Sequence, residues 1–171
     1  MFFLNNYDDK IVKYDLINKF NYKNVISIPK LELIILTFNL KKWDIGSLIN
    51  LLSSLKLIML KTPKITTSKI SNVVFKIRKG QPIGCKLTLR KIYFHKFLFI
   101  LINKILPKSK FTKITKHNMF SLTLKNVLIF NELEQNYQFF KNLPGLNIHF
   151  KVSKSTHKEL IYLIKSYKLL T

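Results

Sequence analysis

The sequence predicts an α+β fold, in which an antiparallel or mixed sheet carries helices on one face and a basic surface on the other. Residues 146–152 alternate between apolar and polar side chains, which is typical of a half-buried strand. Thr156 followed by Glu159 forms a capping-box pattern that opens a segment with apolar residues at helical spacing. Strand-like and helix-like segments do not alternate strictly, which favours α+β over a parallel α/β arrangement.

Length and composition indicate one folded domain with a polyanionic partner. The chain has 171 residues, of which 47% are hydrophobic, so it is long and apolar enough to bury a core. Its formal net charge is +22, from 30 lysines and arginines against 8 acidic residues. A charge this high predicts binding to nucleic acid, with an anionic membrane surface as the second candidate.

Three elements are expected in the N-terminal part. Asp8 and Asp9 are positioned to cap a first helix, in which apolar residues recur at helical spacing. The apolar run at 31–38 is short enough for a buried strand. Asp44 begins a second helix, and the polar segment 61–72 that follows it is expected to be a loop. The buried stripe of the second helix is expected to consist of Ile45, Leu48, Leu51, Leu52, Leu55 and Ile58.

The central stretch from Phe75 to Arg90 contains the clearest strand pattern. From Phe75 to Arg78, apolar and basic residues alternate, and after Gly84 apolar residues alternate with polar ones. Residues 79–82, between these two runs, supply turn chemistry. The pattern predicts two strands with one apolar face and one face bearing cations and a hydroxyl. The only two arginines of the chain lie here, and the planar arginine fork suits phosphate groups and base edges.

The C-terminal part is expected to return to mixed strands and helices. Residues 92–106 form a third helix that Pro107 ends. The lysine-rich segment 108–118 has no apolar rhythm and is expected to be a basic loop, and 121–130 has strand character. The segment 132–142 fits no pattern clearly. Tyr22 and Phe120 are candidates for stacking on bases, with a place in the core as the alternative.

No catalytic or metal-binding constellation is visible. The four histidines, His95, His117, His149 and His157, have no metal-ligand spacing, and the single cysteine, Cys85, is expected in the core. The glycines do not form a nucleotide-type phosphate loop, and the carboxylates are spread thinly. We therefore expect no enzymatic activity, no cofactor and no metal.

Several segments resemble the L-five family of large-subunit ribosomal proteins, in the same order and at matching spacing along almost the whole chain. The central motif is Lys-Ile-Arg-Lys-Gly-Gln-Pro-Ile-Gly-Cys-Lys-Leu-Thr-Leu-Arg at 76–90. Further matches are Phe20–Val25, Ile28–Glu32, Pro63–Thr66, Ser121 with Ile129–Leu133, and Gly145–Ile148. Each segment alone is a weak signal, but the ordered set is specific.

The resemblance implies a single L-five-like domain over 1–171, with a first helix and strand at about 8–40, central strands and a loop at about 61–90, and closing strands and a helix at about 119–168. It implies a structural protein of the central protuberance with an RNA-facing side, which binds 5S rRNA, large-subunit rRNA or both. The further partners that it implies are peptidyl-site tRNA and neighbouring ribosomal proteins, including a small-subunit head protein at an intersubunit bridge.

The resemblance and the basic clusters together define the expected contact residues. The expected rRNA-binding residues are Tyr22, Asn24, Lys30, Thr37, Lys61, Lys86, Thr88, Arg90, Lys108, Lys110 and Lys113. The expected residues of the tRNA-side loop, which spans 64–84, are Lys64, Lys69, Lys76, Arg78, Lys79 and Gln81.

The sequence departs from the family pattern at three places. Residues 37–40 read Thr-Phe-Asn-Leu where the family has Asn-Met-Gly-Val-Gly, and 60–63 lose the glutamine of Gly-Gln-Lys-Pro. Residues 116–121 lack the glycines of Gly-Arg-Gly-Asn-Tyr-Ser. Some organellar ribosomes lack a 5S rRNA, and in such a ribosome these residues would serve other rRNA or neighbouring proteins.

Amino-acid usage points to the genome that encodes the chain. There is no alanine, whereas lysine, asparagine, isoleucine and phenylalanine, which A/T-rich codons specify, are abundant. The first residues carry no pattern of an import signal. Together these features predict an organelle-encoded protein of the mitochondrial ribosome.

Two other functions compete with the ribosomal hypothesis. The first is a basic protein of a membrane surface, for which helix 156–168 is the one candidate amphipathic element. No membrane insertion is expected, because the longest charge-free run, 45–55, is far below the ~20 residues of a transmembrane helix. The second is an RNA-processing accessory protein, which the missing cluster of metal-binding carboxylates weakens.

Overall fold

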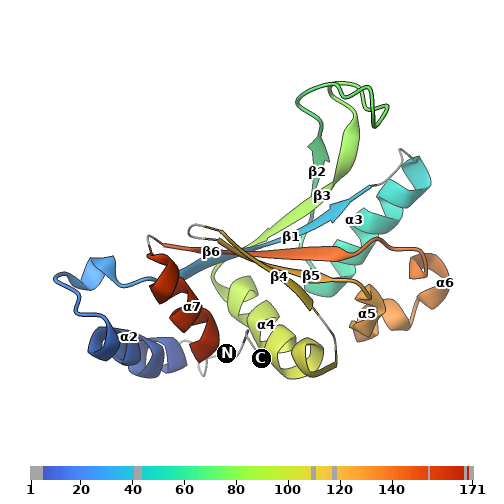
Figure 1. Cartoon of the computed structure of the whole chain (residues 1–171). Helices are drawn as coiled ribbons and strands as arrows, with labels where there is room; N and C mark the ends of the chain where they lie inside the picture. Colours follow the sequence, from blue (N-terminus) through green and yellow to red (C-terminus); the bar gives the residue numbers. More distant parts are fainter. Residues whose placement is uncertain are drawn as a thin grey trace. The chain divides into compact units, whose positions relative to one another are not determined.

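The α+β prediction is confirmed by the computed structural model, which describes residues 6–40, 44–108, 111–116, 119–153, 155–167 and 169, with the backbone alone at 108 and 111–116. Six strands form one sheet in the order β2-β3-β1-β6-β5-β4 (Figure 1). The strands are β1 (Leu31–Asn39), β2 (Lys64–Thr67), β3 (Pro82–Leu89), β4 (Phe111–Lys116), β5 (Met119–Leu124) and β6 (Leu146–Val152). The sheet is antiparallel, as Lys64 opposite Lys86 illustrates for β2 and β3.

The chain divides into two compact units, and β1 and β6 each contribute residues to both. Unit 1 comprises residues 1–34, 89–122 and 149–171, and unit 2 comprises 35–88 and 123–148. In β1 the residues Leu33 and Ile34 are both buried, after which every second residue is buried as far as Phe38. In β6 every second residue from Leu146 is buried, as the sequence pattern predicted.

In unit 1 the first and last helices pack together. The first helix runs over π-helical Asp8–Val12 (η1) and α2 (Lys13–Lys19), and the last is α7 (His157–Ser166). The predicted capping box of α7 is confirmed, since the Thr156 hydroxyl accepts from the Glu159 N–H and the Glu159 carboxylate accepts from the Thr156 N–H.

The predicted capping role of Asp8 and Asp9 is wrong, because residues 6 and 7 before them are already helical and no side chain caps η1. Asp8 instead accepts a hydrogen bond from the Tyr167 hydroxyl, and the Tyr7 hydroxyl donates to the Ser166 carbonyl at 2.9 Å. These bonds join the two helices. Burial raises the pKa of Asp8 to about 6, an effect that the Tyr167 hydrogen bond partly offsets.

The third predicted helix is present in unit 1 as α4 (Ile92–Ile100), continued by π-helical Leu101–Ile105 (η3) and a 3-10 turn at Leu106–Lys108 (η4). Pro107 lies in the final turn, as expected for a helix terminator. Phe120, one of the two predicted stacking aromatics, is fully buried 5.7 Å from the ring centre of Phe150, so the core alternative holds.

Unit 2 contains the second predicted helix, α3 (Ile45–Met59), and the two short helices α5 (Asn131–Glu134) and α6 (Tyr137–Phe140). Asp44 caps α3 as predicted, and its carboxylate accepts from the Ser47 N–H at 2.9 Å. Most of the predicted stripe is buried, but Ile45 is 63% exposed and Leu52 is only partly covered. The segment that fitted no pattern, 132–142, contributes α6 and most of α5.

Three local expectations are wrong. The run Phe75–Arg78 is not a strand but part of a turn, and β3 pairs instead with β2, which lies within the predicted loop 61–72. The predicted basic loop 108–118 contains β4, which is the last strand of the sheet order. An edge strand tolerates lysines at positions that a central strand fills with apolar side chains, which explains the missing apolar rhythm.

The predicted strand 121–130 is correct only in its first half. β5 ends at Leu124, and a 3-10 turn at Val127–Ile129 (η5) follows. Asn126 caps this turn, since its side-chain oxygen accepts from the Leu128 N–H at 3.0 Å. Val127 and Phe130 are therefore buried by a turn rather than by sheet pairing.

Candidate nucleic-acid interface

The outer face of β2 and β3 in unit 2 carries opposed lysines. Cys85, Leu87 and Leu89 of β3 are buried, so Lys86 and Thr88 occupy the other face of the strand. Lys64 of β2 lies directly opposite Lys86, and both side chains are exposed. Like charges at directly opposed positions of an antiparallel pair repel each other, so this pair is stable only where an anion or solvent screens it. Such a pair is suited to a phosphate backbone.

A close approach of two strands brings β1 to this lysine-bearing face. The Leu40 N–H donates to the Ile83 carbonyl at 2.8 Å. Gly84 permits the approach, because a Cβ atom there would lie 2.1 Å from the Phe38 carbonyl oxygen. Phe38 is fully buried and points into the core. Because successive side chains of a strand point to opposite faces, Thr37 and Asn39 both lie on the outer face of β1.

Lys61, one of the predicted rRNA-binding residues, is anchored to β3. Its ammonium group donates to the Thr88 carbonyl at 2.8 Å. This bond holds the positive charge of Lys61 close to the end of β3. Thr88 itself is half-buried on the outer side of the strand.

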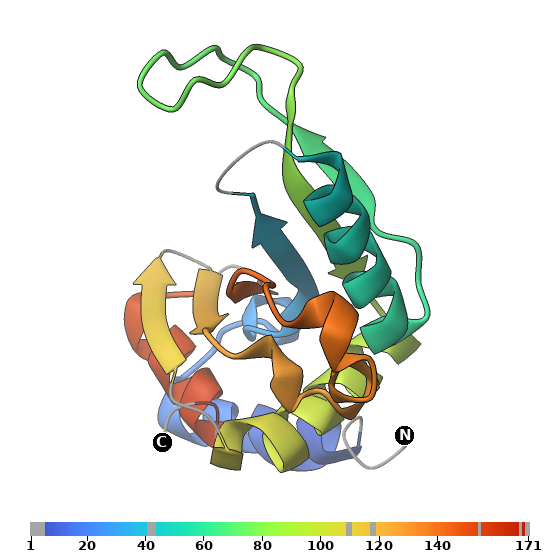
Figure 2. The ribbon, with the colours of Figure 1, turned by 90° about the vertical axis from the view of Figure 1, so that its right-hand side faces the viewer.

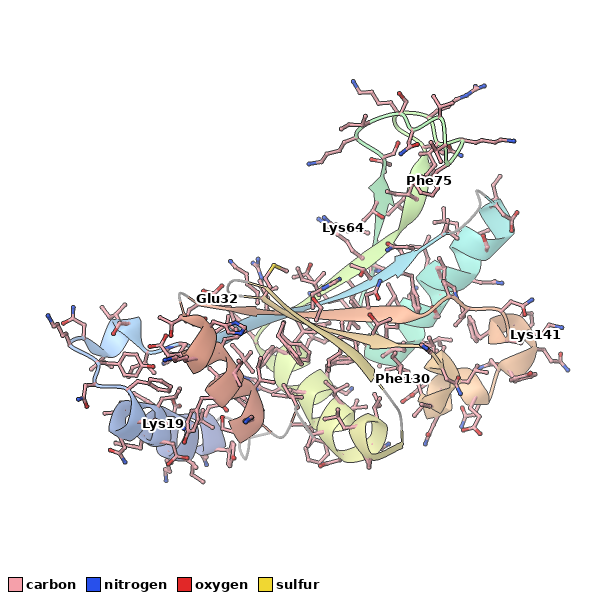
Figure 3. The ribbon with its side chains drawn as sticks, in the orientation of Figure 1. Lys19, Glu32, Lys64, Phe75, Phe130 and Lys141 are labelled. Atoms are coloured by element: carbon pink, nitrogen blue, oxygen red, sulfur yellow. The ribbon has the colours of Figure 1, made fainter. Side chains whose placement is uncertain are left out.

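The connection between β2 and β3 is a loop, residues 68–81, that projects beyond the ends of both strands (Figures 1 and 2). Four of its predicted contact residues are exposed, and all four are cationic. They are Lys69, Lys76, Arg78 and Lys79. Figure 3 shows Lys64 on β2 below the loop.

Gln81, the remaining predicted residue of the loop, shapes the backbone. Its side-chain oxygen accepts from the Arg78 N–H at 3.0 Å, and its carbonyl accepts from the Ser68 N–H at 2.9 Å. The Ser68 hydroxyl donates to the Arg78 carbonyl, and the Ser68 carbonyl accepts from the Gly80 N–H at 3.0 Å. The base of the loop is therefore closed by a network that holds the backbone on which Arg78 and Lys79 are carried.

Tyr22, Asn24, Lys30 and Arg90, all predicted contact residues, belong to unit 1. Asn24 is exposed in the turn before η2 (Val25–Ser27), and Arg90 is exposed directly after β3. Tyr22 packs against Phe20, with ring centres 6.5 Å apart, and its hydroxyl is buried. Burial and the nearby Glu159 carboxylate raise the pKa of this hydroxyl.

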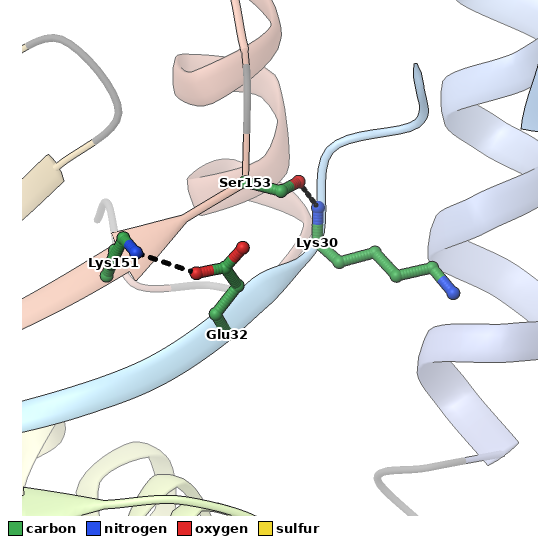
Figure 4. Close-up of polar contacts among 4 residues, drawn as sticks. All are labelled: Lys30, Glu32, Lys151 and Ser153. Atoms are coloured by element: carbon green, nitrogen blue, oxygen red, sulfur yellow. Dashed lines mark hydrogen bonds and ion pairs between the residues drawn. The ribbon is translucent and has the colours of Figure 1, made fainter. Parts of the chain in front are cut away.

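Lys30, the fourth residue, belongs to the junction of β1 and β6 (Figure 4). Its backbone N–H donates to the Ser153 hydroxyl at 2.8 Å, while its side chain extends away from the neighbouring ion pair. That ion pair joins Lys151 to Glu32 at 3.1 Å and is solvent-exposed. Lys151 is therefore paired with Glu32, whereas Lys30 lines a hollow together with the acidic residues Asp8 and Asp9.

Three predicted rRNA-binding lysines, at 108, 110 and 113, lie in or next to η4 and β4. Lys108 belongs to η4 and Lys113 to β4, and Lys110 lies outside the described residues. They remain predictions.

Sequence reasoning missed polar pairs on β5 and β6. In unit 1 the Ser121 hydroxyl is 2.8 Å from Nδ1 of His149, and burial lowers the pKa of this imidazole. In unit 2 the Thr123 hydroxyl donates to the Asn147 side-chain oxygen at 2.9 Å. The period-two pattern of 146–152 marked Asn147 and His149 as outward-facing, but it did not identify their cross-strand partners.

Among the described residues, the side chains that could hold a metal ion are not grouped together and the one cysteine is buried. Among them, no three histidine, cysteine, aspartate or glutamate side chains are grouped so as to hold a metal ion. Cys85 is buried, and burial raises the pKa of its thiol to about 12. Within the same residues, every helix is too short or too polar to cross a bilayer.

Comparison with known proteins gives consistent matches along the chain. The family model that describes the C-terminus of the ribosomal L5 protein family matches residues 82–170. The large ribosomal subunit protein uL5m of Reclinomonas americana is 34% identical over 174 residues, covering 97% of this chain and 96% of the relative. The uL5 protein of Geotalea daltonii is 35% identical, with coverages of 95% and 94%. The uL5 protein of Nitrosomonas eutropha is 32% identical, also with 95% and 94%.

Proposed function

Because the chain belongs to the uL5 family of large-subunit ribosomal proteins, which are structural components of the ribosome and not enzymes, we propose that it binds rRNA through the outer face of β2 and β3. The observation that carries this proposal is the register that sets Lys64 directly opposite Lys86. Phosphate groups relieve the repulsion between the two lysines, and release of their counterions favours binding. Lys61, held at the end of β3, extends the same cationic surface.

The bound RNA in this proposal is 5S rRNA, the adjoining large-subunit rRNA or both, at the central protuberance. Thr37 and Thr88 supply uncharged hydrogen-bonding groups beside the lysines, and Arg90 continues the basic series past the end of β3. Tyr22, Asn24 and Lys30 would add a contact from unit 1. The lysines at 108, 110 and 113 would contribute phosphate contacts.

The projecting loop 68–81 is the proposed contact to peptidyl-site tRNA. Its four exposed cations lie on a backbone closed at its base by Ser68 and Gln81. A neighbouring protein of the small-subunit head is proposed as the partner at an intersubunit bridge. We also propose a mitochondrial location, supported by the similarity to a mitochondrial uL5m and by the A/T-rich amino-acid usage.

The experiment that tests the proposal is sedimentation of organelle lysate on a sucrose gradient, with the chain followed by mass spectrometry. Co-sedimentation with large subunits after a moderate salt wash is expected, and ultraviolet crosslinking of the same fractions should join peptides containing Lys64 or Lys86 to rRNA. A chain that stays at the top of the gradient would contradict assembly into the large subunit. Crosslinks confined to tRNA or to protein would contradict rRNA binding by the β2–β3 face.

A further inference from the structure

The loop 68–81 exposes a cluster of large apolar side chains that none of the described elements of its own unit covers. Val73 is 91% exposed, Val74 is 84% exposed and Phe75 is 71% exposed. Single exposed apolar residues are common, but a contiguous group marks an interaction surface. We call residues 72–77 the apolar turn; Figure 3 shows Phe75 on it, beyond the end of β3.

The apolar turn is held by its own hydrogen bonds. Asn72 and Ile77 bond to each other through both backbone N–H groups, at 2.9 and 3.0 Å. The Lys76 N–H donates to the Val73 carbonyl at 3.0 Å, and the Asn72 side-chain oxygen accepts from the Phe75 N–H. The apolar side chains are thus displayed on a closed backbone, which lowers the entropy cost of binding through them.

Lys76 lies in the left-handed region, with a φ of +53°. A residue other than glycine is strained in this conformation. The bonds of the turn hold the backbone there. Lys76, which directly follows Phe75 in the chain, is thus a cationic residue on this closed backbone.

The electrostatic surroundings identify the class of partner. Lys69, Lys76, Arg78 and Lys79 flank the exposed apolar residues, and none of the eight acidic residues of the chain lies between Asp44 and Glu132. An apolar aromatic surface flanked by cations complements a nucleotide within an RNA strand, which has an apolar base face and a phosphate on either side. The position of the loop, at the end of the lysine-bearing strands β2 and β3, favours the same polyanion.

We propose that the Phe75 ring stacks on an exposed nucleobase of RNA, with Val73 and Val74 covering the edge of the contact. This inference rests on the RNA-binding function proposed above and adds a base contact to its phosphate contacts. Stacking on a base tolerates any base identity and contributes about 1–3 kcal/mol per base, which corresponds to roughly 5- to 150-fold in affinity. Because no phosphate is neutralised by the ring, this contribution does not change the salt slope of binding.

The test uses the full chain and two synthetic RNAs. One is a hairpin with 2-aminopurine at an unpaired loop position, and the other is a blunt duplex of the same length with every base paired. The parent chain should bind the hairpin and quench the 2-aminopurine fluorescence. Phe75→Ala should weaken hairpin binding by about tenfold, abolish the quenching and leave the salt slope and duplex binding unchanged. Phe75→Trp should retain both the hairpin affinity and the quenching of the parent.

Phe139→Ala is the matched control, because Phe139 on α6 is 69% exposed and lies outside the loop. It should leave both RNAs bound as in the parent. Equal hairpin binding by Phe75→Ala and the parent would overturn the stacking contact while leaving phosphate binding intact. Failure of the parent chain to bind either RNA would overturn both proposals.

Binding to vesicles of phosphatidylcholine and phosphatidylserine distinguishes stacking on RNA from contact with a membrane surface. An exposed apolar turn with flanking lysines is also compatible with an anionic lipid surface. If Phe75→Ala weakened vesicle binding and left hairpin binding unchanged, the apolar turn would be a membrane contact and the stacking proposal would be wrong. We expect no effect of Phe75→Ala on vesicle binding.

Discussion

Gly84 and Phe38 lie so close across β1 and β3 that no side chain fits between them: a Cβ atom at position 84 would be 2.1 Å from the Phe38 carbonyl oxygen. Gly84→Ala must therefore push two central strands apart. We expect a loss of about 1–3 kcal/mol or more in the free energy of unfolding, the range for overpacking in a closed interior. Urea denaturation followed by far-ultraviolet circular dichroism measures it.

Gly46→Ala is the control for this substitution. A Cβ atom at position 46, in the first turn of α3, would approach no atom closer than 3.4 Å, the distance to Oδ2 of Asp44. We expect little change or a gain of up to about 1 kcal/mol from the reduced entropy of the unfolded chain. Equal destabilisation by both substitutions would argue against the close strand approach.

The burial of Asp8 should make stability depend on pH. Burial raises the pKa of Asp8 from its ordinary value near 4 to about 6, so the folded chain binds this proton more tightly than the unfolded chain does. The contribution of Asp8 to stability is fully present below about pH 4 and is lost as the pH rises through about 6. Thermal unfolding of the parent and of Asp8→Asn at several pH values isolates this contribution.

The difference in Tm between the parent and Asp8→Asn should shift in favour of the parent as the pH is lowered from about 7 to about 5. Tyr167→Phe removes the hydroxyl that donates to the Asp8 carboxylate, so the pKa of Asp8 should rise further and the transition should move to higher pH. A constant Tm difference across this window would show that Asp8 is not buried as described.

The capping box of α7 should contribute measurably to stability. Thr156→Ala removes the acceptor for the Glu159 N–H and should lower the free energy of unfolding by about 1 kcal/mol, the usual effect of losing an N-cap. Thr156→Ser keeps a hydroxyl at the same place and should restore most of the loss. Equilibrium denaturation of the three proteins checks this, and no recovery with serine would assign the effect to the threonine methyl group.

Lys64 and Lys86 should act as phosphate contacts and not as readers of sequence. Each neutral variant, Lys64→Gln or Lys86→Gln, should reduce the slope of log affinity against log salt by about 1 and should weaken binding equally for unrelated RNA sequences. Lys125→Gln and Lys141→Gln are matched controls, because both lysines are exposed in unit 2 outside β2 and β3. Filter binding at several salt concentrations measures the slopes.

An unchanged slope in both β-strand variants would remove the β2–β3 face from the RNA interface. The same variants should raise or leave unchanged the stability of the free protein, since they relieve repulsion between opposed cations. A loss of stability would point to a structural role for the lysines.

The sequence by itself determined the elements whose signals are local. The cap at Asp44, the capping box at Thr156 and the alternation over 146–152 each depend on residues within one turn or one strand, and each is present in the structure. The order of motifs along the chain also pointed to the family, because each motif is a short run of neighbouring residues. These features could be predicted because their energetics do not depend on distant partners.

Only the tertiary structure decided which strand pairs with which. The alternation from Phe75 to Arg78 is as regular as that of β3, yet these residues form a turn, because Lys64–Thr67 is the segment that reaches the edge of β3. The opposition of Lys64 and Lys86, on which the proposed interface depends, follows from that register. Pairing between these two segments is set by packing of the opposite face, where Cys85 and Leu87 are buried, and a linear pattern does not contain that information.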